Sequence, residues 1–169
     1  PRAVQAVSIP VLAGGGFATG AGIAAALALG AEGVVMGTRF MAVQESIVHE
    51  NIKQWMINAD ETQTAIIQKT IKSPSRVALN EVSRQVMQLE QEGKGLEELL
   101  PYITGQRTKA VYFDGDVDGG VWSCGQSVAL VEDVPTTQEL VRRLFQEAEE
   151  AILRLNRIFN MAQKFREEG

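Results

Sequence analysis

The distribution of charge divides the chain into an apolar N-terminal part and a longer amphipathic part. Between Arg2 and Glu32 lie 29 consecutive uncharged residues. Within this run, residues 9–13 are continuously apolar and end in glycines, which is typical of a strand buried on both faces. Residues 20–29 are alanine-rich and apolar on nearly every side, which predicts a closely packed helix, and residues 33–36 predict a second strand. A strand, a helix and a strand within about thirty residues predict a βαβ unit with parallel strands.

Beyond this unit the pattern becomes amphipathic. Apolar residues recur every three or four positions in three windows that predict helices: residues 43–58, 61–72 and 75–92. A turn-rich stretch at residues 105–120 and a short apolar segment at residues 121–131 follow. Thr136 and Glu139 have the spacing of a capping box, so we expect a long last helix over residues 137–166. Its apolar residues lie on one seam: Val141, Leu144, Ala148, Ile152, Leu155 and Phe159.

Composition and charge narrow the class of protein. Hydrophobic residues make up 45% of the 169 residues and charged residues 22%, which favours a globular domain over a disordered chain. The net charge of -5 disfavours an electrostatic attraction to nucleic acid or to an anionic membrane. The uncharged run contains Pro10 and a cluster of glycines, so it predicts neither a membrane span nor a signal peptide. We therefore expect a cytoplasmic protein without nucleic-acid or membrane partners.

The sequence gives little support for a metal site or a reactive thiol. His49 is the one histidine and Cys124 the one cysteine, so a three-histidine zinc site and an internal disulfide are both excluded. We expect His49 to be a surface or interdomain hydrogen-bonding group and Cys124 a small core residue. The aspartates at positions 114, 116 and 118 begin like a calcium loop, but the twelfth position is Gly125 and not glutamate. A solvated turn is the better interpretation, and we predict no metal site.

The glycines that follow the two predicted strands suggest an anion site. Gly15 and Gly16 would let backbone N–H groups converge on an anion, and Gly37 with Thr38 would add a second set and a hydroxyl. For either glycine segment taken alone, the alternative to an anion site is a tight turn in which glycine is needed for its positive φ. Residues 20–25 also match the dinucleotide fingerprint G-x-G-x-x-A, but they begin too far beyond the strand, and helix packing explains their small size equally well. Two such turns on adjacent parallel strands favour a phosphate site.

These residues carry a family resemblance. Residues 9–34 (IPVLAGGGFATGAGIAAALALGAEGV) and 36–40 (MGTRF) resemble the C-terminal half of the nitronate monooxygenases, formerly called 2-nitropropane dioxygenases. Flavin-containing enoyl-acyl-carrier-protein reductases are close relatives of that family. The likeness reaches about Ile152 and continues through several short segments: Glu45, Ser46, His49 and residues 75–80, 115–116, 122–126, 133–135 and 139–141.

The resemblance implies an α/β fold, the C-terminal part of a TIM-type (β/α)₈ barrel that binds FMN, with residues 9–13 and 34–36 as its seventh and eighth strands. Residues 1–58 would carry these strands and the phosphate-binding turns. Residues 59–120 would form an inserted, mainly helical lid, and residues 121–169 a return segment with a long helix that flanks the barrel.

The resemblance also assigns site residues. Gly15, Gly16, Met36, Gly37 and Thr38 fall on the phosphate-binding turns of the family and would bind FMN. The catalytic histidine of the family lies on an earlier strand, and His49 does not match its motif, so we assign no catalytic residue in this chain. The first six strands of a barrel are also absent. We therefore expect a fragment, or one piece of a split enzyme, that is inactive alone and whose partner is the missing N-terminal half.

The activity implied by the resemblance is the FMN-dependent oxidative denitrification of alkyl nitronates, with a small nitronate or nitroalkane and O₂ as substrates. An FMN- and NAD(P)H-dependent enoyl-acyl-carrier-protein reductase is the alternative, because both enzymes share the flavin turns. A non-catalytic fragment or an oligomeric interaction module is an alternative of another class. The seam over residues 141–159 gives that last hypothesis limited support, as it would suit a homo-oligomer.

Overall fold

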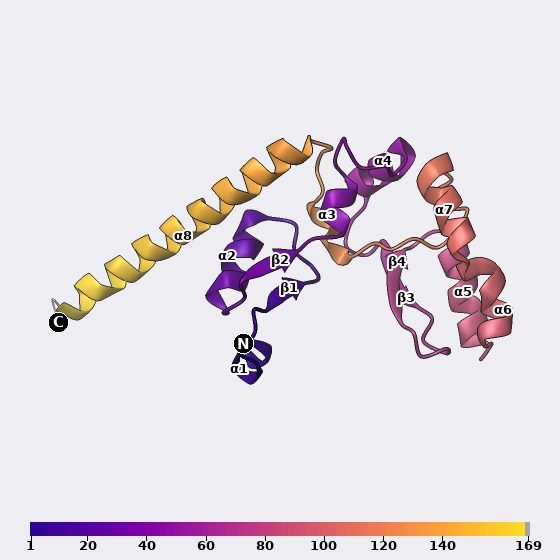
Figure 1. Ribbon diagram of the computed structural model, residues 1–169, viewed down its shortest axis with the longest axis horizontal. Helices are drawn as coiled ribbons and strands as arrows, with labels where there is room; N and C mark the ends of the chain where they lie inside the picture. Colours follow the sequence, from indigo (N-terminus) through magenta and orange to yellow (C-terminus); the bar gives the residue numbers. More distant parts are fainter. Residues whose placement is uncertain (168–169) are drawn as a thin grey trace. The chain divides into compact units, whose positions relative to one another are not determined.

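The computed structural model describes residues 1–167, with side chains described as far as Met161, and it contains two compact units (Figure 1). The first unit combines Pro1–Met36 with Thr136–Gly169, and the second comprises Gly37–Pro135. The second unit is therefore an insertion between two parts of the first. The three functional parts expected from the sequence, divided near residues 58 and 120, stay a prediction.

The first unit contains the predicted βαβ motif. After the short helix α1 (Arg2–Ala6), strand β1 (Leu12–Gly14) pairs in parallel with β2 (Gly33–Val35), and helix α2 (Gly20–Ala28) connects them. The register places Leu12 beside Gly33 and Gly14 beside Val35. Both strands are shorter than expected, but their order and direction are confirmed.

Helix α2 packs closely on the long helix α8 (Thr137–Glu167) of the same unit (Figure 1). The Gly20 N–H donates to Glu147 Oε2 at 2.7 Å, and a Cβ on Gly20 would overlap the α8 backbone at Leu144 and Ala148. Gly20, the first residue of the dinucleotide-fingerprint match, therefore has a packing role, because only glycine permits this approach of two helices. The predicted start of α8 is confirmed, since the Thr136 hydroxyl accepts from the Glu139 N–H at 3.1 Å.

The second unit is mixed in secondary structure. Its strands β3 (Thr64–Ile67) and β4 (Ser75–Ala78) form an antiparallel hairpin. Its helices are α3 (Thr38–Met41), α4 (Glu50–Asn58), α5 (Glu81–Gln91), α6 (Leu96–Ile103), α7 (Gly105–Asp114) and the 3₁₀ helix η1 (Gln126–Leu130).

The hairpin corrects two helix predictions. Residues 61–72 contain β3 and not a helix, because β-branched Thr64, Ile66 and Ile67 favour an extended chain that pairs with β4. Residues 75–92 begin as β4, and a helix starts only at Glu81. The sequence window had merged a strand and a helix whose apolar residues happen to continue the same spacing.

Two other boundaries differ because helix caps decide them. Helix α4 starts at Glu50 and not near residue 43, since the His49 side chain accepts from the Asn51 N–H and so caps the helix at His49. The stretch 105–120 is helical as far as Asp114, where Gly115 ends α7 at a φ of +75°. The turn predicted there is confined to the last few residues.

Two apolar clusters hold the second unit together. One surrounds the buried Trp122 and includes Ile52 and Met56 of α4; the other lies between the hairpin, α5 and α6, with Val86 and Leu99 at its centre. Within residues 1–167, no helix is both long and apolar enough to cross a membrane.

Candidate functional site

The turn after β1 has the backbone of a glycine-specific loop. Gly15 and Gly16 have φ values of +101° and +81°, which other residues rarely adopt. A Cβ added to either glycine would meet nothing within 4 Å, so the space beside this backbone is open. The glycines thus serve a turn conformation and leave room for a bound group beside it.

The parallel pairing brings the ends of the two strands together. Because Gly14 pairs with Val35, Gly15 and Met36 each follow the same end of neighbouring parallel strands. This is the carboxyl edge, where α/β proteins bind their ligands. Within the first unit, Gly15 and Met36 therefore lie at one edge of the sheet, and a phosphate site there stays a prediction.

Gly37 and Thr38 continue directly from Met36 and begin the second unit. The space beside Gly37 is open, and Thr38 is the first residue of α3. The Thr38 Oγ1 atom accepts from the Gly125 N–H at 2.9 Å. A hydroxyl that already accepts one bond keeps its hydrogen to donate elsewhere, for example to a phosphate oxygen. Gly125 is therefore a supporting residue that the sequence did not indicate.

Arg39 fixes the segment that carries Thr38. Its side chain is 3% exposed, and the guanidinium donates to the Ala42 carbonyl, to the Asp133 carbonyl and to Asp133 Oδ1 at 2.8 Å. Charge-assisted bonds of this kind are stronger than neutral ones and impose geometry. The sequence offered one signal of this role, namely a charged side chain that comes soon after an apolar strand and a glycine.

His49 and the aspartates have structural roles. The His49 side chain caps α4, since its Nδ1 accepts from the Asn51 N–H, and this confirms the expected hydrogen-bonding role. The backbone N–H of His49 donates to the Tyr112 carbonyl at 2.7 Å. Asp118 Oδ1 accepts from the Glu81 N–H at 3.0 Å at the start of α5. Over the residues that the structure describes, no group of three or more His, Cys, Asp or Glu side chains could hold a metal ion.

Cys124 is 2% exposed and unpaired by any disulfide, which confirms its predicted place in the core. Burial raises the pKa of its thiol from 9.0 to about 12, so it stays protonated at neutral pH and is no nucleophile there.

We expect Cys124 to resist alkylation at pH 8.5 in the folded chain and to react readily in urea, because only unfolding exposes it and restores an ordinary pKa. The same shift means that its contribution to folding stability is complete below pH 9 and is lost as the pH rises toward 12. Iodoacetamide labelling followed by mass spectrometry measures both states. Equal rates with and without urea would show that the thiol is accessible.

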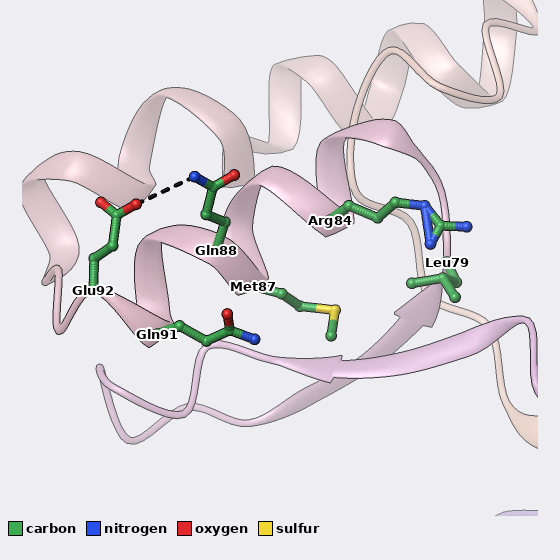
Figure 2. Close-up of a pocket in the computed structure, with 6 residues that line it drawn as sticks. All are labelled: Leu79, Arg84, Met87, Gln88, Gln91 and Glu92. Carbon is green, nitrogen blue, oxygen red and sulfur yellow. Dashed lines mark hydrogen bonds between the residues drawn. The ribbon is translucent and has the colours of Figure 1, made fainter.

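A separate groove of about 670 Å³ lies on α5 (Figure 2). Figure 2 shows Met87 and Gln91 on the side of α5 that faces the hairpin, and the Gln88 amide donates to the Glu92 carboxylate at 3.2 Å. Arg84 is the cation among the residues that line it. The lining of this open groove offers no nucleophile and no acid–base pair for chemistry.

Comparisons with known proteins find one family model and several relatives. The sequence model of the family described as nitronate monooxygenase matches residues 1–147. A probable nitronate monooxygenase of Staphylococcus aureus is 48% identical over 66 residues, which is 39% of this chain and 19% of that protein.

Two longer matches extend over most of the chain. A (3aS,4S,5R,7aS)-5-hydroxy-7a-methyl-1-oxo-octahydro-1H-indene-4-carboxyl-CoA dehydrogenase of Rhodococcus jostii is 31% identical over 83% of this chain and 50% of that protein. The structure of FabK from Thermotoga maritima superposes with a TM-score of 0.82 at 31% identity, over 92% of this chain and 49% of that one. The chain thus spans about half the length of these two relatives. The predicted fold class, the C-terminal part of a TIM-type barrel, is confirmed.

Proposed function

Because the chain belongs to the nitronate monooxygenase family of flavin-dependent oxidoreductases, we propose that it is part of an FMN-dependent enzyme that oxidises alkyl nitronates with O₂. FMN, when bound, would supply the redox chemistry at its isoalloxazine ring. The chain's own contribution would be to bind the FMN phosphate and to provide a lid from residues 59–120.

The observation that carries this proposal is the open glycine turn at the carboxyl edge of β1 and β2. A phosphate needs several N–H donors and room close to the backbone, and the turn at Gly15 and Gly16 provides that room. We propose that these glycines, with Met36, Gly37 and Thr38, bind the phosphate through backbone N–H groups and the Thr38 hydroxyl. Barrels commonly bind phosphate after their seventh and eighth strands, which fits the order of these turns.

The rest of the barrel would complete the enzyme. Leu12 and Val35 are exposed on the two strands, as is Ile9 just before them, although parallel strands are normally covered on both faces. We propose that strands from the N-terminal half of a barrel cover these side chains and contribute the catalytic base. None of the described residues is assigned that role.

An NAD(P)H-dependent enoyl-acyl-carrier-protein reductase remains the second candidate, because the likeness to FabK fits it. The two candidates differ in the electron donor. Bleaching of the flavin by NADPH would favour the reductase, whereas O₂ consumption with an alkyl nitronate would favour the monooxygenase.

The test of the proposal measures FMN fluorescence quenching by this chain after the first six strands of a family barrel have been added. We expect FMN to bind to the mixture and O₂ to be consumed when propyl-2-nitronate is supplied. A folded mixture that binds no FMN would contradict the proposal. A mixture that binds FMN but whose flavin reacts only with NADPH would favour the reductase over the monooxygenase.

Within that complex, Thr38→Val should weaken FMN binding about tenfold, since it removes one hydroxyl donor to an anion while keeping the side-chain volume. Thr38→Ser keeps the hydroxyl and is the matched control, for which we expect a change of less than about threefold. Fluorescence titration gives both dissociation constants. Equal FMN affinity of the two variants would show that the Thr38 hydroxyl does not bind the phosphate.

A further inference from the structure

Ser127, in η1, carries a hydroxyl that the fold does not use. The residue is 7% exposed, and its hydroxyl forms no hydrogen bond with any residue that the structure describes. The next residue, Val128, is fully buried in the cluster around Trp122, so an alanine at position 127 would suit the packing equally well. A polar group that is removed from water costs free energy unless it finds a hydrogen-bond partner. The hydroxyl therefore indicates a partner that binds from outside the described chain.

The oxygen of this hydroxyl is open to such a partner. Within the described residues, every side-chain nitrogen or oxygen that is fully enclosed has a hydrogen-bond partner. The Ser127 Oγ atom has none, so it is not fully enclosed, although most of the residue is buried. A hydroxyl in this position can donate its hydrogen to a bound group without any rearrangement of the core.

The Thr38 hydroxyl lies close to the same glycine as the Ser127 hydroxyl. A Cβ added to Gly125 would lie 3.2 Å from Thr38 Oγ1 and 3.5 Å from Ser127 Oγ, so both oxygens face one side of Gly125. Thr38 Oγ1 accepts from the Gly125 N–H at 2.9 Å, and its own hydrogen has no acceptor among the described residues. Two unused hydroxyl donors are therefore present at one place.

The class of ligand follows from these two donors. Both oxygens lie within 3.5 Å of one point, so they are no more than about 7 Å apart, a gap that two O–H···O bonds of about 2.7 Å to one bound group can bridge. A phosphate monoester offers several oxygen acceptors at once. Hydrogen bonds to a charged acceptor are also stronger than those to a neutral one. The pair of hydroxyls therefore fits a phosphate.

Backbone hydrogen bonds fix the segment that carries Ser127. The Ala78 N–H of β4 donates to the Trp122 carbonyl at 3.1 Å, which ties the preceding residues to the hairpin. The Val128 N–H donates to the Gly125 carbonyl at 3.0 Å and so closes the turn around Ser127. Donors that are already held in place lose little freedom when they bind a ligand.

We infer that Ser127 is a further phosphate-binding residue, whose hydroxyl donates together with that of Thr38 to the phosphate of FMN. The inference rests on the proposed function, because that function supplies the flavin. It adds a residue of the segment that follows Trp122 to the glycine turns that follow the strands. All three residues that carry it, Thr38, Gly125 and Ser127, belong to the second unit.

The test compares FMN with riboflavin, which has the same ring system but no phosphate. It uses the complex of this chain with the first six strands of a family barrel. Ser127→Ala should raise the dissociation constant for FMN about tenfold and change that for riboflavin less than about twofold. Ser123→Ala is the matched control, because Ser123 is an exposed serine of the same segment, and it should change neither constant. Fluorescence titration measures all of these constants.

Three results would overturn the inference. Unchanged FMN affinity in Ser127→Ala would show that the hydroxyl does not bind the phosphate, while the proposed function would stand. Equal losses of affinity for FMN and riboflavin, or a lower urea midpoint for Ser127→Ala in the 169-residue chain, would show that the hydroxyl serves the fold or the assembly instead. An unmodified complex that binds no FMN would overturn the proposed function together with the inference.

Discussion

Replacing Trp122 with alanine is expected to lower the free energy of unfolding of the second unit by about 3–5 kcal/mol. The indole is 1% exposed and lies at the centre of an apolar cluster. Its ring packs edge-on against Trp55 with ring centroids 4.9 Å apart, and Nε1 donates to the Val117 carbonyl at 3.2 Å. The substitution therefore leaves a large cavity, which accounts for most of the loss, and removes one of the two donors to the Val117 carbonyl, the other being the Asn80 amide.

Urea denaturation followed by far-UV circular dichroism measures this loss, since it does not depend on the fluorescence of the deleted indole. Phe113→Ala is the control, because Phe113 is an aromatic residue of the same unit that lies half exposed. We expect that control to change stability by less than about 0.5 kcal/mol. Similar losses in the two variants would mean that Trp122 does not anchor the cluster.

Asn80→Ala should cost about 2–4 kcal/mol, the second largest effect we expect. The side chain is 4% exposed and its oxygen caps α5 by accepting from the Ser83 N–H at 2.8 Å. Its amide donates to the Val117 carbonyl at 2.7 Å and to the Gly120 carbonyl at 2.8 Å. Alanine would remove the cap and the donor to the buried Gly120 carbonyl, whereas the Val117 carbonyl would keep the Trp122 Nε1 donor.

A matched control separates this effect from the loss of any asparagine. Asn58→Ala removes an exposed side chain that donates to the Gln54 carbonyl, so we expect almost no change in the urea midpoint. Asn80→Asp keeps the capping oxygen but turns a carboxylate oxygen toward both carbonyls in a site that is 4% exposed, so it should destabilise the chain at least as much as Asn80→Ala. If Asn80→Asp were as stable as the unmodified chain, the bonds to residues 117 and 120 would contribute nothing.

The parts of the fold that could be predicted from the sequence are those that local chemistry determines. The glycine turns and the start of α8 depend on residues within a few positions of one another, and the two parallel strands are separated only by the single helix α2. Thr136 caps α8 from three residues away, and Gly15 and Gly16 permit positive φ by themselves. Such features appear in the sequence because no distant partner is needed to form them.

The features that the sequence did not reveal depend on pairing between distant segments. Strand β3 exists because β4 pairs with it, and short windows cannot show that partner. The bond from the Gly125 N–H to Thr38 spans 87 positions, and that from Arg39 to Asp133 spans 94. Local periodicity carries no information about such contacts, so it predicted the candidate glycines but not the residues that support them.

The closure of the inserted unit has a consequence for how this architecture can diversify. Its first and last residues are held side by side, because Arg39 binds Asp133 and the Gln44 N–H donates to the Pro135 carbonyl at 2.9 Å. A segment whose ends lie together can be lengthened, shortened or exchanged as a block without rerouting the host chain, as circular permutation and domain insertion also require. Evolution, or a protein engineer, can therefore graft a different insertion between residues 36 and 136 while leaving the β1–α2–β2 scaffold intact.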